Sequence, residues 1–185
     1  GLRPTMHWGT YLTDKSRPLN SFLLEHRSGM RVLCAPPVPP IDRWFTDSDI
    51  ETGLTALTNA ARLIVVDMPP KLTASERPLL DHAHRIVLIT GDDPPSIQTT
   101  LATLKSPRAW RNRILIVHNA TDPGKHPKAE TLERMMRVPI KVDLPYDPTQ
   151  QKLMRNGTPL VSRQPQSPFA AQIRRIVQLT LGRSL

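Results

Sequence analysis

Polar residues stand just past three apolar runs of the sequence, and their types define the chemistry that the chain could support. Asp67 ends the run RLIVVD, Asn119 follows the run RILIVH, and Asp147 lies three residues past the run that ends at Leu144. A carboxylate at the position of Asp67 could bind Mg²⁺, orient a water, accept a phosphoryl group or cap a turn. The amide of Asn119 offers a donor and an acceptor, which suits a purine edge and equally suits a helix cap or an Asx turn.

A fourth group of polar residues, Gly91-Asp92-Asp93, separates another apolar run from Pro94-Pro95. Two adjacent carboxylates could form a cation site. A pair of prolines directly afterwards is typical of the first turn of a helix, so the sequence favours a helix N-cap with a solvated neighbour. Asp147 precedes Pro148 and presents the same choice.

The apolar runs predict the strands that must position these side chains. Short runs rich in Val and Ile are typical of strands buried on both faces of a parallel sheet. The predicted strands are residues 30–35, 62–67, 85–90, 113–118 and 140–144. Helices are predicted at residues 18–26, 48–61, 75–82, 96–104, 128–137, 149–155 and 169–181.

Strands that alternate with helices of about ten residues predict βαβ units and a three-layer α/β sandwich with a mostly parallel sheet. The carboxyl ends of parallel strands share one edge, where open α/β sheets bind their ligands. We therefore expect one site there, built from Asp67, residues 91–93, Asn119 and residues 145–147. The helix over residues 48–61 is predicted to begin with a capping box of Ser48 and Glu51.

Length predicts one domain over residues 1–185. Residues 1–28 are poorly patterned, residues 29–161 carry the predicted sheet and helices, and residues 162–185 form a connector and a C-terminal helix. That helix has an apolar stripe that suits packing against the sheet or, alternatively, a membrane surface. The single cysteine excludes an intrachain disulfide and indicates a reducing cytoplasm.

The net charge of +9 favours an anionic partner such as DNA or an acidic lipid surface. However, the basic residues are scattered, and three Trp, two Tyr and three Phe leave few rings for base stacking. A solvated basic surface explains the same composition. No apolar run approaches the roughly 18 residues of a membrane span.

Two family resemblances follow from these motifs. VVDMPP at residues 65–70 resembles the phosphoacceptor strand of a response-regulator receiver, with Thr90 as its switch threonine. The acidic pair after the first strand and the late Lys-Pro of receivers are absent. The chain resembles MinD/ParA-type P-loop ATPases more closely, over about residues 19–161, and above all the TadZ/CpaE-like branch of Flp pilus assembly. The motifs are HRSGMRVLCAP, LIVVDMPP, ILIVHN and LPYDP followed by LMRNGTPL.

The MinD/ParA resemblance implies roles for individual residues. Asp67 would help organise Mg²⁺ and the attacking water, Asn119 would contact the adenine of ATP, and Pro145, Tyr146 and Asp147 would line the adenine pocket. It also implies a nucleotide-bound homodimer that works with pilus assembly and secretion proteins, in the cytoplasm, at the inner face of the membrane or at a cell pole.

The sequence departs from this family at the phosphate-binding loop. The motif K-G-G-x-G-K-S/T is absent, and the only Gly-Lys pair, Gly124-Lys125, is followed by His-Pro. Without such a loop Asp67 has no phosphate to act on. The chain is therefore expected to lack the N-terminal βα unit, either as the C-terminal part of a longer ATPase or as a degenerate relative. We expect no catalysis by the chain alone, and the alternative is a non-enzymatic interaction module with a basic surface.

Overall fold

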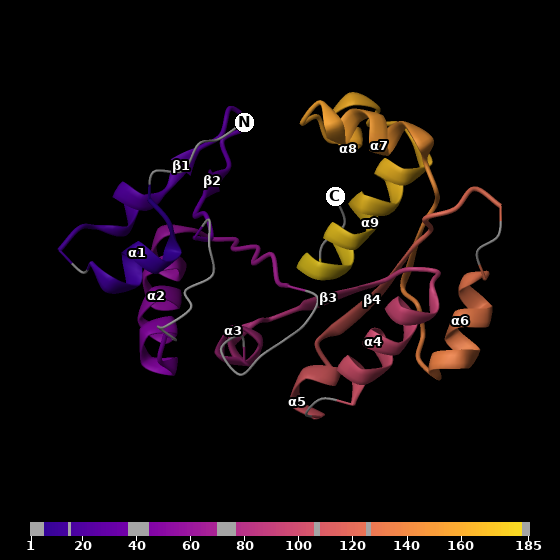
Figure 1. Ribbon diagram of the computed structural model, residues 1–185, viewed down its shortest axis with the longest axis horizontal. Helices are drawn as coiled ribbons and strands as arrows, with labels where there is room; N and C mark the ends of the chain where they lie inside the picture. Colours follow the sequence, from indigo (N-terminus) through magenta and orange to yellow (C-terminus); the bar gives the residue numbers. More distant parts are fainter. Residues whose placement is uncertain are drawn as a thin grey trace. The chain divides into compact units, whose positions relative to one another are not determined.

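A computed structural model describes residues 6–14, 16–36, 45–69, 77–105, 108–124 and 127–182. The chain divides into two compact units, Gly1–His82 and Ala83–Leu185. Both units combine helices with strands, and among the described residues only the second unit contains parallel strands (Figure 1).

The second unit is built on a parallel sheet with the strand order β3-β4-β5. The strands are β3 (Ile86–Thr90), β4 (Ile114–Asn119) and β5 (Val142–Leu144). Helices α4 (Pro94–Leu104) and α5 (Arg108–Arg111) connect β3 to β4, and α6 (Ala129–Met136) connects β4 to β5. After β5 come α7 (Pro148–Arg155), α8 (Leu160–Arg163) and α9 (Pro168–Leu181). Helical crossovers of this kind are what parallel neighbours require.

Apolar side chains cover both faces of this sheet. On one face α8 and α9 pack against β4 and β5, and on the other α4 packs against α6 (Figure 1). The first cluster contains Leu115, Val117, Val142, Leu144, Leu160 and Phe169, and the second contains Ile97, Leu132 and Met136. Helices therefore sandwich the sheet, which confirms the predicted α/β fold class.

The first unit is mainly helical. It comprises α1 (Trp8–Thr13), the 3-10 turn η1 (Leu19–Phe22), an antiparallel pair β1 (Leu24–Glu25) and β2 (Arg31–Val32), α2 (Asp47–Ala60) and α3 (Arg77–His82). Buried apolar side chains come from α1, η1 and α2, among them Leu12, Phe22 and Ile50. The ring of Phe22 meets Tyr11 edge-on, with 5.3 Å between the ring centroids.

The N-cap of helix α2, Thr46, lies two residues before the N-cap that the sequence predicts, Ser48. The Thr46 hydroxyl accepts from the Asp49 N–H at 3.2 Å, and the Asp49 carboxylate accepts from the Thr46 N–H at 3.1 Å, which is a capping box. Ser48 and Glu51 have the same three-residue spacing as Thr46 and Asp49, so the sequence pattern alone does not distinguish the two helix starts.

Two strand predictions in the first unit were wrong. The run at residues 30–35 supplies only the two residues of β2, in an antiparallel pair rather than in the parallel sheet. The run at residues 62–67 belongs to no strand, and Val65 is 85% exposed. An apolar run becomes a strand only when a neighbouring backbone accepts its hydrogen bonds, and within the described ranges none does.

Of the helix predicted over residues 18–26, only the 3-10 turn η1 (Leu19–Phe22) is helical, because β1 (Leu24–Glu25) follows almost directly.

Candidate functional site

The end of the central strand β4 places Asn119 beside the residues that follow β5. Asn119 is paired with Leu144 in the parallel register, and the Ala120 N–H donates to the Leu144 carbonyl at 3.0 Å. Pro145, the first residue after β5, therefore starts next to Asn119. The structure thus brings Asn119 and the predicted segment of residues 145–147 to one sheet edge, where each of these four residues is half-buried.

Asp147 is the N-cap of α7. Its carboxylate accepts from the Thr149 N–H at 2.8 Å, and Pro148 occupies the first position of the helix. The cap satisfies an orphan donor of the first turn and fixes the direction in which the chain leaves the edge. The geometry therefore supports the interpretation of Asp147 as a helix cap.

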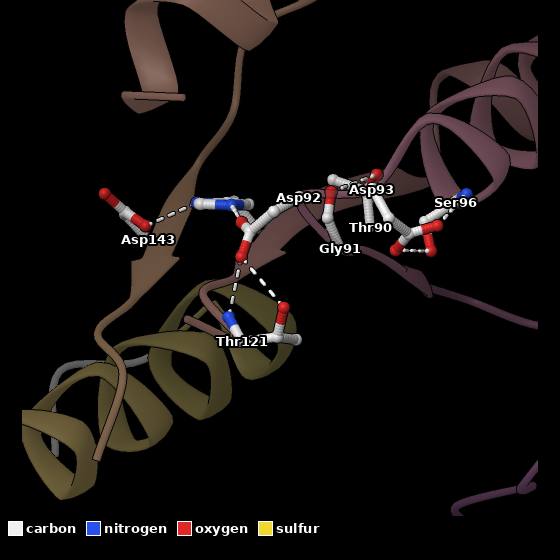
Figure 2. A network of polar contacts seen from close by, with 8 residues as sticks. Thr90, Gly91, Asp92, Asp93, Ser96, Thr121 and Asp143 are labelled. Atoms are coloured by element: carbon white, nitrogen blue, oxygen red, sulfur yellow. Dashed lines mark hydrogen bonds and ion pairs between the residues drawn. The ribbon is translucent and has the colours of Figure 1, made fainter. Parts of the chain in front are cut away.

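Asp93 caps α4 in the same way, as the sequence favours. Its carboxylate accepts from the Ser96 N–H at 2.9 Å and from the Ser96 hydroxyl at 2.6 Å. The hydrogen bonds from the Ser96 side chain and backbone lower the pKa of Asp93 below its ordinary value. Figure 2 shows Asp93 directed toward Ser96, whereas Asp92 points the other way, toward Thr121.

Asp92 is not the solvated neighbour that the sequence suggests. Its side chain is only 10% exposed and belongs to a set of polar residues that we call the strand-end network: Asp92, His118, Thr121 and Asp143. Asp92 Oδ2 accepts from the Thr121 N–H at 2.7 Å and from the Thr121 hydroxyl at 3.0 Å (Figure 2). Asp92 Oδ1 contacts His118 Nε2, and His118 Nδ1 lies 2.7 Å from Asp143 Oδ1.

Burial and hydrogen bonding act on Asp92 in opposite directions. Burial alone raises the pKa of this carboxyl, whereas the hydrogen bonds from the Thr121 backbone, His118 and the Thr121 hydroxyl lower it. Together the hydrogen bonds outweigh the burial, and the pKa of Asp92 lies below its ordinary value. Asp92 therefore stays ionised to a lower pH than an ordinary aspartate does. Its carboxylate holds the loop after β4 against the loop after β3.

His118 was not predicted from the sequence to be a site residue. The available signal was a histidine inside an otherwise apolar strand run, which calls for a polar partner because a buried imidazole needs hydrogen bonds. The partners lie 26 and 25 residues away, so only the strand register identifies them: Thr90, His118 and Asp143 occupy one row across the sheet.

Asp67 belongs to the first unit and has an exposed side chain there. Its role in Mg²⁺ binding stays a prediction. Within the described part of the chain no group of three or more His, Cys, Asp or Glu residues is arranged to hold a metal ion. One carboxylate suits Mg²⁺ only when phosphate oxygens and waters complete the octahedron. In the same ranges no helix has the length and apolar character to cross a membrane.

No protein-family model matches the chain. An uncharacterised ATP-binding protein of Methanocaldococcus jannaschii is 23% identical over 135 residues, which cover 72% of this chain and 51% of that protein. The chain thus spans about half the length of this curated relative.

Solved structures resemble the chain over nearly its whole length. A ParA family ATPase of Chlorobium tepidum matches with a TM-score of 0.78 at 17% identity, covering 98% of this chain and 78% of that one. A chain of the MinC:MinD cell division protein complex of Aquifex aeolicus matches with a TM-score of 0.72 at 17% identity, covering 99% of this chain and 76% of that one. The chain therefore has the fold of the ParA and MinD P-loop ATPases. At these identities the likeness establishes the fold alone.

Proposed function

We propose that the chain supplies the base-binding half of a MinD/ParA-like ATPase that positions or assembles a pilus secretion machine. The observation that carries the proposal is Asn119 at the carboxyl end of β4, beside Pro145 and Tyr146 at the end of β5, in a chain with this fold. That edge is where open α/β sheets bind ligands.

The side chains at this edge suit an adenine base. The Asn119 amide makes no hydrogen bond to another described residue, which leaves a donor and an acceptor for a purine edge. Pro145 and Tyr146 supply apolar surface beside it, while the Asp147 carboxylate is occupied by the α7 cap. We assign Asn119 to base recognition, Pro145 and Tyr146 to the pocket wall, and Asp147 to positioning that wall.

The phosphate-binding half is proposed to lie outside these 185 residues, because the sequence contains no K-G-G-x-G-K-S/T motif. Two observations support this. The M. jannaschii relative is about twice as long as the region it shares with the chain. In addition, β3 is an edge strand that pairs only with β4 among the described strands, so its other edge has room for a further strand there. Asp67 would act on Mg²⁺ and water only with that half present.

A nucleotide titration tests the base-binding assignment. Adenosine, AMP and ATP should bind the 185-residue chain with similar, weak dissociation constants, on the order of 1 mM, because the phosphates meet no loop. Nuclear magnetic resonance should report the binding at Asn119 and residues 145–147. Asn119→Ala should abolish it, whereas Asn112→Ala, an exposed Asn near the opposite end of β4, should not.

Binding by Asn119→Ala at the wild-type level would contradict the assignment. Mg²⁺-dependent ATP turnover by the 185 residues that Asp67→Ala abolishes would contradict the division into two halves.

The partners proposed for the complete protein are a second copy of itself and proteins of a pilus assembly machine, in the cytoplasm at the inner membrane face or a cell pole. Light scattering of the natural gene product with and without ATP tests the homodimer. Fluorescence microscopy of a tagged copy tests the location. A diffuse signal that is unaffected by removal of the pilus genes would contradict the pilus role.

A second candidate function, a basic interaction module, is favoured by where the charge lies. Residues 148–182 carry five basic and no acidic residues. Lys152, Arg155, Arg163, Arg174 and Arg175 are all exposed. If these residues bind DNA, the affinity should fall steeply between about 50 and 200 mM salt. An affinity that does not change with salt would exclude DNA binding through these residues.

A further inference from the structure

His118 is completely buried although it is polar. It is the last residue but one of β4, and its ring lies at the carboxyl end of the central strand. Both ring nitrogens are in contact with carboxylates, Nε2 with Asp92 and Nδ1 with Asp143. Those carboxylates come from the loop after β3 and from β5, so the ring connects three strand ends.

The two carboxylates define what the ring must offer. An ionised carboxylate only accepts hydrogen bonds, and a neutral imidazole has one N–H and one lone pair. Each carboxylate can accept a hydrogen bond from the ring nitrogen that faces it. The ring and Asp92 are buried whereas Asp143 is 53% exposed, so the loss of Asp92 or of His118 would leave a buried polar group without its partner.

The contacts continue from His118 through Asp92 to Thr121, two residues after Asn119, and Ala120 is held by a separate bond. Asp92 uses its second oxygen to hold the Thr121 N–H and hydroxyl (Figure 2). The Ala120 N–H is held by the Leu144 carbonyl. The chain is therefore held before Asn119 by the ring of His118 and after it by the N–H groups of Ala120 and Thr121, while the Asn119 amide remains unengaged by the described residues. The backbone contacts therefore fix the position of the Asn119 side chain and leave its own donor and acceptor groups available.

We infer that His118 and Asp92 are positioning residues that hold Asn119 and the loop to Thr121 in the orientation that receives a purine base. The inference rests on the proposed function and adds the device that sets the geometry of its base-binding side chain. His118 and Asp92 do not touch the base; they act through the backbone of Ala120 and Thr121.

The two adjacent aspartates provide the experiment. Asp92→Ala removes the contact to Thr121, and Asp93→Ala is the matched control because it removes only the α4 cap. Hydrogen exchange of the Ala120 and Thr121 amides, measured without ligand, should accelerate at least tenfold in Asp92→Ala and in His118→Leu but not in Asp93→Ala. Adenosine affinity, measured by titration, should fall about tenfold, or about 1.4 kcal/mol, in the first two variants only.

The outcomes separate this inference from the proposed function. Unchanged exchange at Ala120 and Thr121 in both network variants overturns the inference. Faster exchange with unchanged adenosine affinity also overturns it, because the loop would then be held for some other reason. If the wild-type chain binds no adenosine while exchange responds as expected, the base-binding function fails, and with it the purine part of the inference. Near-ultraviolet circular dichroism identifies variants that have not folded, and His118→Gln then replaces His118→Leu.

Discussion

Apolar runs form paired strands in the second unit of this chain, whereas a comparable run in the first unit does not. In the second unit, the runs at β3, β4 and β5 pair in parallel, and helices cover both faces of the sheet. In the first unit, the equally apolar run at residues 62–67 pairs with no described strand and leaves Leu63, Val65 and Val66 exposed. Local composition is the same in both cases, so the availability of a partner strand decides whether a run becomes a strand.

The units also differ in charge. The first unit has nine basic and nine acidic residues, whereas the second has sixteen basic and seven acidic residues. The whole net charge of +9 therefore resides in the unit that carries Asn119 and the strand-end network. An anionic ligand of either proposed kind, a nucleotide or a nucleic acid, would be attracted to that unit.

The largest expected effect tests whether the two units are independent in stability. Phe22→Ala should lower the free energy of unfolding of the first unit by about 3–5 kcal/mol, and Leu132→Ala that of the second by about 2–5 kcal/mol, because both side chains are fully buried. Hydrogen exchange followed by mass spectrometry should show each loss of protection in one unit only. Equal losses in both units from either variant would show that the chain unfolds as one body.

A smaller effect is expected from the contact between α1 and α2 in the first unit. A Cβ added at Gly53 would lie 2.1 Å from Trp8 Cη2, and the indole is rigid. Gly53→Ala should destabilise the first unit by about 1–3 kcal/mol, because the overpacking exceeds the roughly 1 kcal/mol that alanine contributes in a helix. Chemical denaturation measures it.

Gly124 in the second unit provides the matched control for Gly53. A Cβ there has no neighbour within 4 Å. Gly124→Ala should therefore change the free energy of unfolding by less than about 0.5 kcal/mol. A Gly53→Ala protein as stable as the wild type would show that Trp8 can leave α2 without loss.

The strand-end network should make the second unit sensitive to acid. The pKa of Asp92 is lower in the folded chain than its ordinary value of 3.8, so the folded chain binds this proton less readily than the unfolded chain does. The stability from Asp92 is fully present above about pH 4, and it is lost as the pH falls through the folded pKa. Asp92→Asn should destabilise the second unit by about 1–2 kcal/mol at pH 7, with a smaller difference from wild type in acid.

Chemical denaturation of the wild type and of Asp92→Asn from pH 7 to pH 3 measures the difference in their free energies of unfolding. A difference that stays constant over this pH range would rule out the ionised Asp92 carboxylate as its source.

The smallest expected effect concerns the exposed run of the first unit. Val65→Thr should change stability by less than about 0.5 kcal/mol, because Val65 is 85% exposed. Val117→Thr, which places a hydroxyl at a fully buried position of β4, should cost about 1–3 kcal/mol. Comparable costs at the two positions would mean that residues 62–67 are buried in solution, most simply by a partner strand.

The sequence predicted the second unit well because its signals are local. The proline pair after Asp93 and the apolar run of β4 each define an element from within a few residues, and α4 and β4 lie within a residue or two of their predicted limits. Asn119 was found for the same reason, since it follows a buried run directly. Residues 62–67 carry an equally local signal, but a strand also needs a partner that no local pattern supplies.

Residue types and order alone predicted the βαβ alternation of the second unit, favoured a cap at Asp93, and predicted the arrival of Asn119 and residues 145–147 at a common edge. Only the tertiary structure decided that Asp92 turns away from its neighbour Asp93 and joins His118, because the parallel register brings together residues that are 25 or more positions apart. It also decided that the run ending in Asp67 stays exposed. The hydrogen bonds along a strand edge join two segments of the chain, so the sequence of one apolar run does not show which segment will pair with it.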